Sequence, residues 1–191
     1  MGLFSWFFNF LNYLGLFQKK ARILLLGLDN AGKSTLLNML KYGKVSTPQP
    51  TQQEVHAQLM LGSLRIDAID LGGHETARAA WRDHYVGADA VVFVVDANDS
   101  PRFSEARKEL HELLNDKLLE TVPFVILGNK IDLPGAVSEA QLKQDLGIGL
   151  LCTGKQKNPQ PQDIRPLEVF MCSVVEKTGF AEAFKYLSDY L

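Results

Sequence analysis

The chain has 191 residues, of which 46% are hydrophobic and 22% charged, and its formal net charge is −2. This length suits one sizeable α/β domain, and the near-neutral balance argues against a nucleic-acid-binding protein, which usually has a clear basic excess. The two cysteines, Cys152 and Cys172, lack the C-x-x-C spacing of a zinc site and are too few for a disulfide framework. We therefore expect a reducing, cytosolic environment.

The amino-terminal segment is dominated by aromatic and aliphatic side chains. Ser5, Asn9 and Asn12 interrupt it at a spacing that places these polar side chains on one narrow stripe of a helix. This pattern predicts an interfacial helix whose apolar side inserts into a membrane, and packing of the same side chains on the domain itself is the alternative. We expect an amphipathic membrane-binding helix at residues 1–18 and a single globular domain at residues 19–191.

Other membrane signals fit this segment poorly. It is shorter than the roughly 20 apolar residues of a transmembrane span. It also lacks the basic start and the small-residue cleavage site of a signal peptide. Trp6 stands where N-myristoylation requires serine or threonine, and the last four residues, SDYL, contain no prenylation cysteine.

Apolar runs of strand length alternate with helical stretches along the rest of the chain. This alternation predicts an α/β fold with a mostly parallel six-stranded sheet and helices on both faces. The second and third strands form a hairpin, and the polar segment 153–165 is expected to be a surface loop. The expected strands are residues 22–27, 53–61, 64–71, 88–96, 122–129 and 166–172, and the expected helices are residues 33–40, 104–115, 138–146 and 179–191.

Residues 27–34 read GLDNAGKS and lie between the first expected strand and the first expected helix. In this context the motif predicts a phosphate-binding loop, in which backbone N–H groups and the helix N-terminus surround phosphate oxygens. Lys33 would reach the β- and γ-phosphates, and Ser34 would offer its hydroxyl to Mg²⁺. Asp29 is either a helix-capping acid or a Mg²⁺ ligand through water. The expected nucleotide-binding residues of this segment are Asn30, Ala31, Gly32, Lys33, Ser34 and Thr35.

Two later segments complete the expected phosphate site. Thr51, in a proline-flanked loop, is the candidate to coordinate Mg²⁺ when GTP is bound, and Asp70 would hold the Mg²⁺ shell. The Gly73 N–H could bond the γ-phosphate and so sense its presence. The imidazole of His74 is placed to orient the attacking water. Because no arginine of the chain is an obvious partner for the phosphates, we expect slow hydrolysis and an arginine supplied by another protein, worth roughly 10³–10⁵ in rate.

Residues 129–132 read NKID and follow the strand at 122–129. The Asp132 carboxylate can accept from both N1–H and the 2-amino group of guanine, whereas adenine would leave it unpaired at a cost on the order of 1–3 kcal/mol. Asn129 would tie this loop to the phosphate loop, and the Lys130 stem would lie against the base. The motif is weak alone, but together with the phosphate loop it predicts GTP and GDP as ligands.

These motifs together resemble the Ras-like small GTPases. LGLDNAGK at residues 26–33 and DLGGH at residues 70–74 are similar to the Arf/Sar branch. Histidine at position 74, instead of the glutamine usual in Arf proteins, and RPLEVFMCSV at residues 165–174 resemble the Sar family. The resemblance implies the P-loop small-GTPase fold, and it implies that the loop at Ser173 and Val174 contacts guanine through its backbone.

The resemblance also implies a function. It is that of a GTP-driven switch that assembles the COPII coat at the cytosolic face of the endoplasmic reticulum for transport to the Golgi, with the amino-terminal helix released by GTP and withdrawn with GDP. The implied partners are membrane lipid, a membrane-bound exchange factor and inner coat subunits, including the GTPase-activating one. An Arf-like switch at another membrane, and a membrane-bending module with an inert nucleotide domain, are the alternatives.

Overall fold

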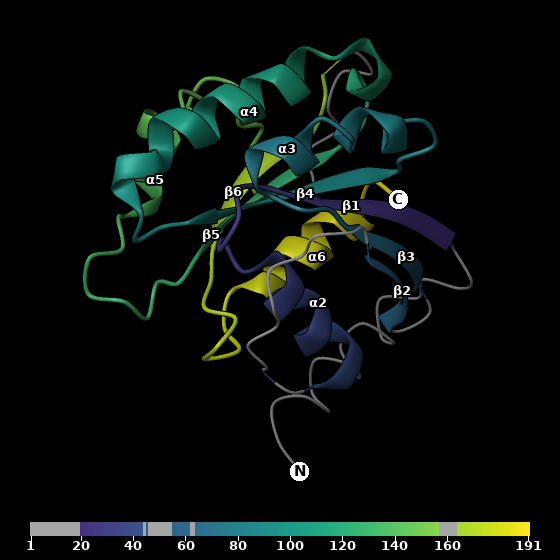
Figure 1. Cartoon of the computed structure of the whole chain (residues 1–191), viewed down its shortest axis with the longest axis horizontal. Helices are drawn as coiled ribbons and strands as arrows, with labels where there is room; N and C mark the ends of the chain where they lie inside the picture. The colour runs from purple at the N-terminus through teal and green to yellow at the C-terminus, as the bar shows by residue number, and fades with distance from the viewer. Residues whose placement is uncertain (1–19, 44, 46–54, 62–63, 157–163) are drawn as a thin grey trace.

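A six-stranded sheet with the order β2-β3-β1-β4-β5-β6 forms the centre of the computed structural model (Figure 1). Only β2 runs antiparallel to its neighbour, so the predicted mostly parallel six-stranded sheet is confirmed. The strands are β1 (Lys20–Leu26), β2 (Val55–Leu61), β3 (Leu64–Asp70), β4 (Ala90–Asp96), β5 (Phe124–Asn129) and β6 (Leu167–Met171). The structure describes residues 20–43, 45, 55–61, 64–156 and 164–191.

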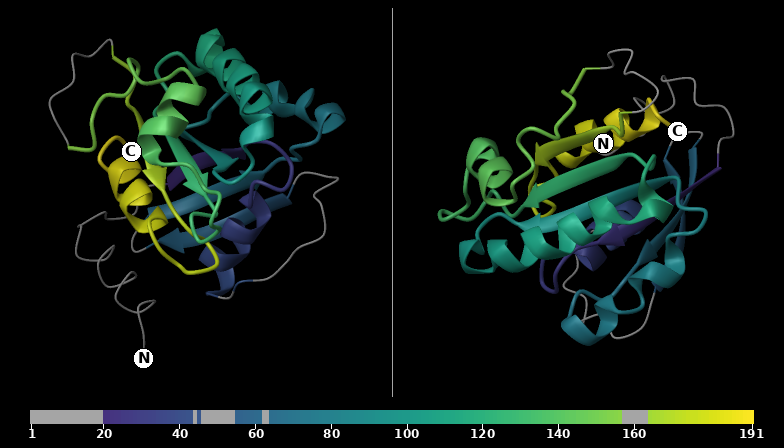
Figure 2. Two further views of the ribbon diagram at one scale, coloured as in Figure 1. Left: turned by 90° about the vertical axis from the view of Figure 1, so that its left-hand side faces the viewer. Right: turned by 90° about the horizontal axis from the view of Figure 1, so that it is seen from above.

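Helices cover both faces of the sheet, as predicted. Helices α2 and α6 lie on one face, and α3, α4 and α5 lie on the other (Figures 1 and 2). The α-helices are α2 (Lys33–Tyr42), α3 (Glu75–Arg78), α4 (Phe103–Asn115), α5 (Glu139–Asp145) and α6 (Phe180–Ser188). Three short 3₁₀ helices are η1 (Trp81–His84), η2 (Ser100–Arg102) and η3 (Lys117–Leu119).

Strand β1 shows how the sheet separates two hydrophobic cores. Successive side chains of a strand point to opposite faces. Leu25 therefore packs with Leu36 and Phe184 from α2 and α6, whereas Leu24 packs with Leu110 from α4. Because every residue of β4 and β5 is buried, the continuous apolar runs predicted from the sequence are the strands that both cores share.

The outer edge of β6 is partly covered by the segment that was expected to be a surface loop. The Thr153 N–H donates to the Leu167 carbonyl at 2.9 Å, and the Gly154 N–H donates to the Glu168 carboxylate at 2.9 Å. A covered edge presents fewer unpaired backbone groups to other chains. Residues 157–163 of the expected loop lie outside the described part of the chain.

Two other expectations also fall outside the described residues. They are the amphipathic helix at residues 1–18 and the Mg²⁺ ligand Thr51. Among the residues that the structure describes, no helix is both long enough and apolar enough to cross a membrane.

Candidate functional site

The predicted motifs meet at one edge of the sheet because the parallel strands end there together. The phosphate loop follows β1, while β3, β4 and β5 end at Asp70, Asp96 and Asn129. The Ala97 N–H donates to the Asn129 carbonyl at 2.8 Å, which joins the ends of β4 and β5. Ligands of open α/β sheets bind at such an edge.

Close packing explains the glycines of the phosphate loop. Gly27 has a φ of 130°, and a Cβ there would lie 2.1 Å from the Val94 carbonyl oxygen. Gly32 has a φ of 103° and precedes α2, and a Cβ there would lie 2.3 Å from Asn129 Nδ2. Only glycine fits both positions, so the loop is pressed against β4 on one side and against the NKID segment on the other.

Lys33 is the buried cation of this loop, with 5% of its surface exposed. Its ammonium donates to the Gly27 carbonyl at 2.8 Å and to the Leu28 carbonyl at 2.9 Å. Burial lowers the pKa of Lys33 to about 8, although the nearby carboxylates of Asp70 and Asp29 act in the opposite direction. A buried ammonium in a loop of this shape is suited to phosphate oxygens.

Two oxygen-bearing side chains lie next to Lys33. The Ser34 hydroxyl donates to Asp70 Oδ2 at 2.5 Å, and Asp70 is 1% exposed. Mg²⁺ prefers oxygen ligands, and one or two carboxylates with substrate phosphates usually hold it. The donor set of Ser34 and Asp70 therefore fits the predicted metal.

Asp29 points elsewhere. Gly32 is the N-cap of α2, and no side chain caps that helix, so the interpretation of Asp29 as a helix-capping acid is wrong. The Asp29 carboxylate instead pairs with Arg102 at 3.0 Å. Its contact with Mg²⁺ through water stays a prediction.

The segment after β3 packs directly on the phosphate loop. A Cβ at Gly73 would lie 2.2 Å from the Asp29 nitrogen, so the two backbones are in contact. His74 follows as the half-buried N-cap of α3, and its carbonyl accepts from the Ala77 N–H at 2.9 Å. Trp81 holds Gly72, the residue before Gly73, because its indole N–H donates to the Gly72 carbonyl at 3.0 Å.

On the base side, neutral hydrogen-bond donors join the loops to one another. The Asn129 amide donates to the Ala31 carbonyl at 2.9 Å, as expected, and its oxygen accepts from the Val174 N–H at 3.1 Å. The buried Ser173 hydroxyl donates to the exposed Asp132 carboxylate at 2.6 Å. The structure thus brings together three predicted segments that are distant in the sequence.

Sequence reasoning missed Asp96 as a member of the site. The Lys130 ammonium lies 2.7 Å from Asp96 Oδ2, and Lys130 takes a φ of 67°. Asp96 closes an apolar strand at the ligand edge, just as Asp70 does, and that parallel position could have identified it.

Arg102 was also missed as a residue that contacts the phosphate loop. It follows β4 within η2 and reaches the phosphate loop, where it bonds Asp29. The contact joins residues 73 positions apart, so no local spacing could have revealed it.

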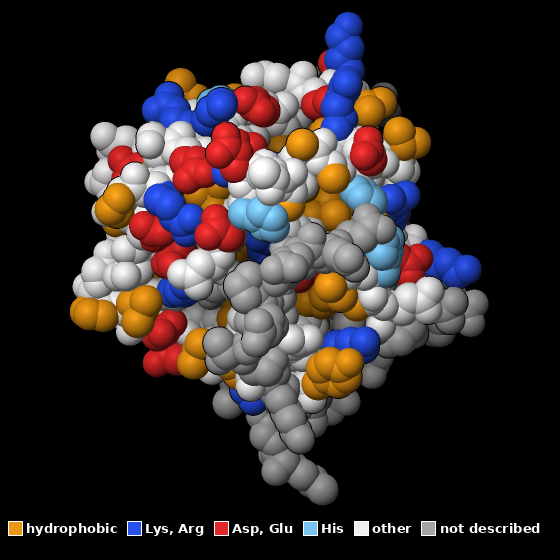
Figure 3. Space-filling model, viewed as in Figure 1, with side chains coloured by type: hydrophobic (Ala, Val, Ile, Leu, Met, Phe, Trp, Pro, Cys, Tyr) orange, Lys and Arg blue, Asp and Glu red, His pale blue; other side chains and the backbone are white. Residues whose placement is uncertain are grey.

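Charges of both signs lie on the described part of the face shown in Figure 3, where acidic and basic side chains are interspersed. Nucleic-acid-binding proteins instead gather their cations into a patch or stripe.

Comparisons with known proteins agree with this geometry. Residues 7–191 match the model of the ADP-ribosylation factor family. The chain is 49% identical over 191 residues to the small COPII coat GTPase SAR1 of Giardia intestinalis, and both chains are covered completely. It is 42% identical over 198 residues to the protein of the same name from Nicotiana tabacum, again over the whole of both chains.

A solved structure has the same fold. The Arl6 BBS3 small GTPase from Trypanosoma brucei, which carries the bound nucleotide analogue GppNp, superimposes with a TM-score of 0.77 at 28% identity. The match covers 90% of this chain and 96% of that one. The predicted small-GTPase fold is confirmed.

Proposed function

The chain belongs to the ADP-ribosylation factor family, and on that premise we propose that it is a guanine-nucleotide switch that recruits the COPII coat to the endoplasmic reticulum membrane. The coat is named in the two relatives described above, which match the whole chain. The observation that carries the nucleotide part is the Asn129 amide, which bonds the phosphate loop and the Val174 backbone together. One side chain therefore makes a single site from the two halves.

In this proposal the base side selects guanine. Asp132 accepts from N1–H and the 2-amino group, since a carboxylate that already holds the Ser173 hydroxyl has lone pairs for further donors. The backbone of Ser173 and Val174 and the stem of Lys130 contact the base. The phosphates are bound by Asn30, Ala31, Gly32, Lys33, Ser34, Thr35 and the Gly73 N–H.

Ser34 and Asp70 would hold Mg²⁺, with Thr51 added when GTP is bound and Asp29 through water. When bound, this ion neutralises charge on the β- and γ-phosphate oxygens. The 2.5 Å hydrogen bond from the Ser34 hydroxyl to Asp70 Oδ2 supports this assignment, because the two oxygen atoms that would bind the ion lie side by side.

Hydrolysis ends the signal. His74 orients the attacking water. It is the N-cap of α3 and directly follows Gly73, whose N–H would bond the γ-phosphate, which supports this role. Arg102 is engaged with Asp29, so an activating partner from the inner coat supplies the arginine that stabilises the transferring phosphate. The isolated protein is therefore slow.

In this proposal residues 1–18 form an amphipathic helix that binds the membrane. The helix inserts at the cytosolic face of the membrane in the GTP state and is withdrawn with GDP, after a membrane-bound exchange factor has acted. Its polar stripe contains few cations, so hydrophobic insertion dominates, at roughly 1.5–3 kcal/mol for each large side chain buried.

Liposome flotation tests this switch. The full-length protein is loaded with GDP or with a non-hydrolysable GTP analogue and mixed with vesicles of neutral lipid. We expect flotation only with the analogue, and its loss when residues 1–17 are deleted. Equal flotation in both states would contradict nucleotide-coupled insertion.

Two further measurements separate the alternatives. Retention of inner COPII subunits on the floated vesicles supports coat recruitment, whereas their absence despite GTP-dependent flotation favours an Arf-like switch at another membrane. Loss of GTP hydrolysis in His74→Gly with nucleotide binding retained excludes an inert nucleotide domain.

A further inference from the structure

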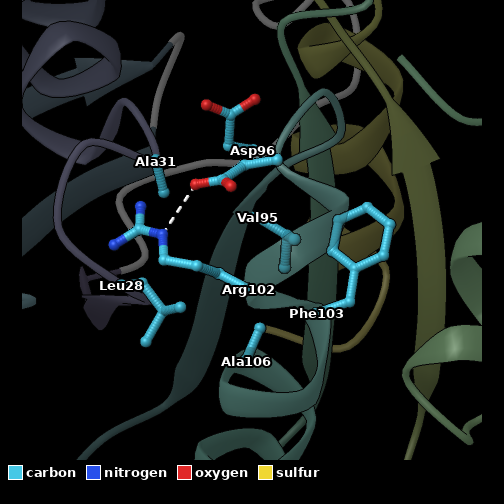
Figure 4. A pocket seen from close by; sticks show the side chains of 8 residues that line it. Leu28, Ala31, Val95, Asp96, Arg102, Phe103 and Ala106 are labelled. Atoms are coloured by element: carbon cyan, nitrogen blue, oxygen red, sulfur yellow. Dashed lines mark hydrogen bonds and ion pairs between the residues drawn. The ribbon is translucent and has the colours of Figure 1, made fainter. Parts of the chain in front are cut away.

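Arg102 contacts the phosphate loop through two hydrogen bonds, and a third bond holds the guanidinium from the other side. Its Nη1 donates to Asp29 Oδ1 at 3.0 Å, and its Nη2 donates to the Asp29 carbonyl oxygen at 2.9 Å. Its Nε donates to Asp99 Oδ2 at 2.6 Å. The guanidinium therefore bonds the side chain and the backbone of one loop residue. Asp99 holds the guanidinium itself, through the bond that is drawn as a dashed line in Figure 4.

Asp29 creates an electrostatic difficulty that this grip resolves. Its carboxylate stands on the loop that would bind nucleotide phosphates, which are themselves anionic, and like charges at short range repel. The side chains of Asp29 and Arg102 are 48% and 30% exposed, so solvent screens this repulsion only in part. A cation bonded to Asp29 cancels most of it.

Arg102 is held in its charged form. Partial burial opposes that charge, but the hydrogen bonds and charges of Asp99 and Asp29 outweigh it and raise the pKa of the guanidinium. An arginine also keeps its charge at any physiological pH, so the neutralisation of Asp29 is permanent.

Packing fixes the position of the side chain. Arg102 borders a small hollow with Leu28 and Ala31 of the phosphate loop and with Phe103 and Ala106 of α4 (Figure 4). Its volume is about 10 Å³, which is near the minimum for one water molecule, so the arginine has little room to move inward. A lysine here would keep the charge but would lose the two bonds that a planar guanidinium makes to one residue.

We propose that Arg102 is a positioning residue of the phosphate site, which acts on the nucleotide through Asp29 by cancelling its charge and fixing its carbonyl. This inference rests on the proposed function as a GTP and GDP binder. Because GTP carries more negative charge than GDP, removal of Arg102 should weaken GTP binding more than GDP binding.

A double-mutant cycle tests the proposal. Dissociation constants of a fluorescent GDP and of a fluorescent non-hydrolysable GTP analogue are measured for full-length wild type, R102A, D29N and R102A/D29N. In R102A we expect affinity for the GTP analogue to fall about tenfold, with a smaller loss for GDP. In the D29N background the same Arg102 substitution should cost clearly less affinity, because the charge to be cancelled is gone and only the bond to the carbonyl of residue 29 is lost.

Matched controls separate this role from general damage. Arg107 is an exposed arginine of α4, and R107A should leave both affinities unchanged. R102K keeps the charge and should lie between wild type and R102A, and it carries the test if R102A fails to fold. The loss in R102A should shrink at high salt, as expected for a partly exposed charge.

Several outcomes would overturn the proposal. An equal loss from R102A with and without D29N would mean that Arg102 touches the nucleotide or only supports the fold. No loss in R102A would also refute it. A loss seen with Mg²⁺ but absent in EDTA would mean that Arg102 acts through the metal shell that Asp29 joins, and not through the charge of Asp29 on the phosphates. If wild type bound neither nucleotide, the proposed function would fail as well, and this control is measured first.

Discussion

The two halves of the nucleotide site are held by different kinds of interaction. On the phosphate side, the Lys33 ammonium donates to carbonyls of its own loop and the Ser34 hydroxyl donates to Asp70. On the base side, the Asn129 amide and the Ser173 hydroxyl join segments that come from three different parts of the chain.

The difference concerns what a nucleotide would have to displace. The Lys33 ammonium, which would bind phosphate, and the Ser34 hydroxyl, which would bind Mg²⁺, are both hydrogen-bonded to protein groups. Nucleotide and metal binding therefore replace these bonds. The Asn129 bonds join the Ala31 carbonyl and the Val174 N–H, and neither group donates to phosphate or Mg²⁺, so these bonds can stay in place when the phosphates bind. The base side is therefore a fixed frame, and the change between nucleotide states belongs to the phosphate side.

Asn129→Ala should have the largest effect, because it breaks the frame itself. Asn129 is 3% exposed, and its loss leaves the Ala31 carbonyl and the Val174 N–H without this partner, at roughly 1–3 kcal/mol each. We expect both a lower melting temperature and at least a hundredfold weaker nucleotide binding. Asn115→Ala, at an exposed helix end, is the control, and an unchanged melting temperature in Asn129→Ala would contradict the comparison.

Lys33→Ala should separate binding from stability. Loss of a charged hydrogen-bond donor to phosphate costs roughly 1.5–3 kcal/mol, or about 10–150-fold in affinity. Removal of a buried charge relieves its desolvation, so the melting temperature without nucleotide should fall less than in Asn129→Ala. Calorimetry and nucleotide titration measure the two quantities, with the exposed Lys108→Ala as the control. A large loss of stability in Lys33→Ala would contradict the comparison, because it would mean that the phosphate side also holds the loops in place.

The pH dependence of nucleotide binding tests whether the Lys33 ammonium exchanges its protein bonds for phosphate. Phosphate binds the protonated form of Lys33, whose pKa burial lowers to about 8. Affinity is therefore complete below that pH and is lost above it, so the dissociation constant should rise about tenfold between pH 7 and pH 9. Lys33→Arg should bind with no such slope, because a guanidinium does not titrate in this range. A flat profile in wild type would show that Lys33 does not exchange its bonds for phosphate.

Trp81 should report the smallest effect, a spectroscopic change without loss of affinity. It is 2% exposed, and its indole N–H bonds the Gly72 carbonyl beside Gly73. Exchange of GDP for a GTP analogue should therefore change its fluorescence, measured in a Trp6→Phe background to remove the other tryptophan. Identical spectra in the two states would place the conformational change elsewhere.

The sequence was informative where the structure is local and apolar. The strands β4 and β5 followed from continuous apolar runs, and the motifs of the site followed from their positions after strands. Helix α3 and η1 were not predicted, because four residues are too few to show an apolar period. Helix α2 continues to Tyr42, two residues beyond the predicted end, because Gly43 ends it in the left-handed region.

Long-range pairing accounts for the rest. The contact of Arg102 with Asp29 and that of Lys130 with Asp96 depend on how the loops after neighbouring strands fold over one edge. The sequence places these residues at that edge but contains no periodicity that pairs them.

The contact of Gly73 with the phosphate loop leaves no free space between the segment after β3 and the loop after β1. With the Asp29 nitrogen already where a methyl group would stand, any ligand atom entering this seam must push the Gly73 backbone outward. The displacement would reach α3, since the next residue, His74, is the N-cap of that helix. The segment thus responds to the volume of a bound ligand as well as to its charge. A side chain at position 73 would separate the two backbones even without a ligand.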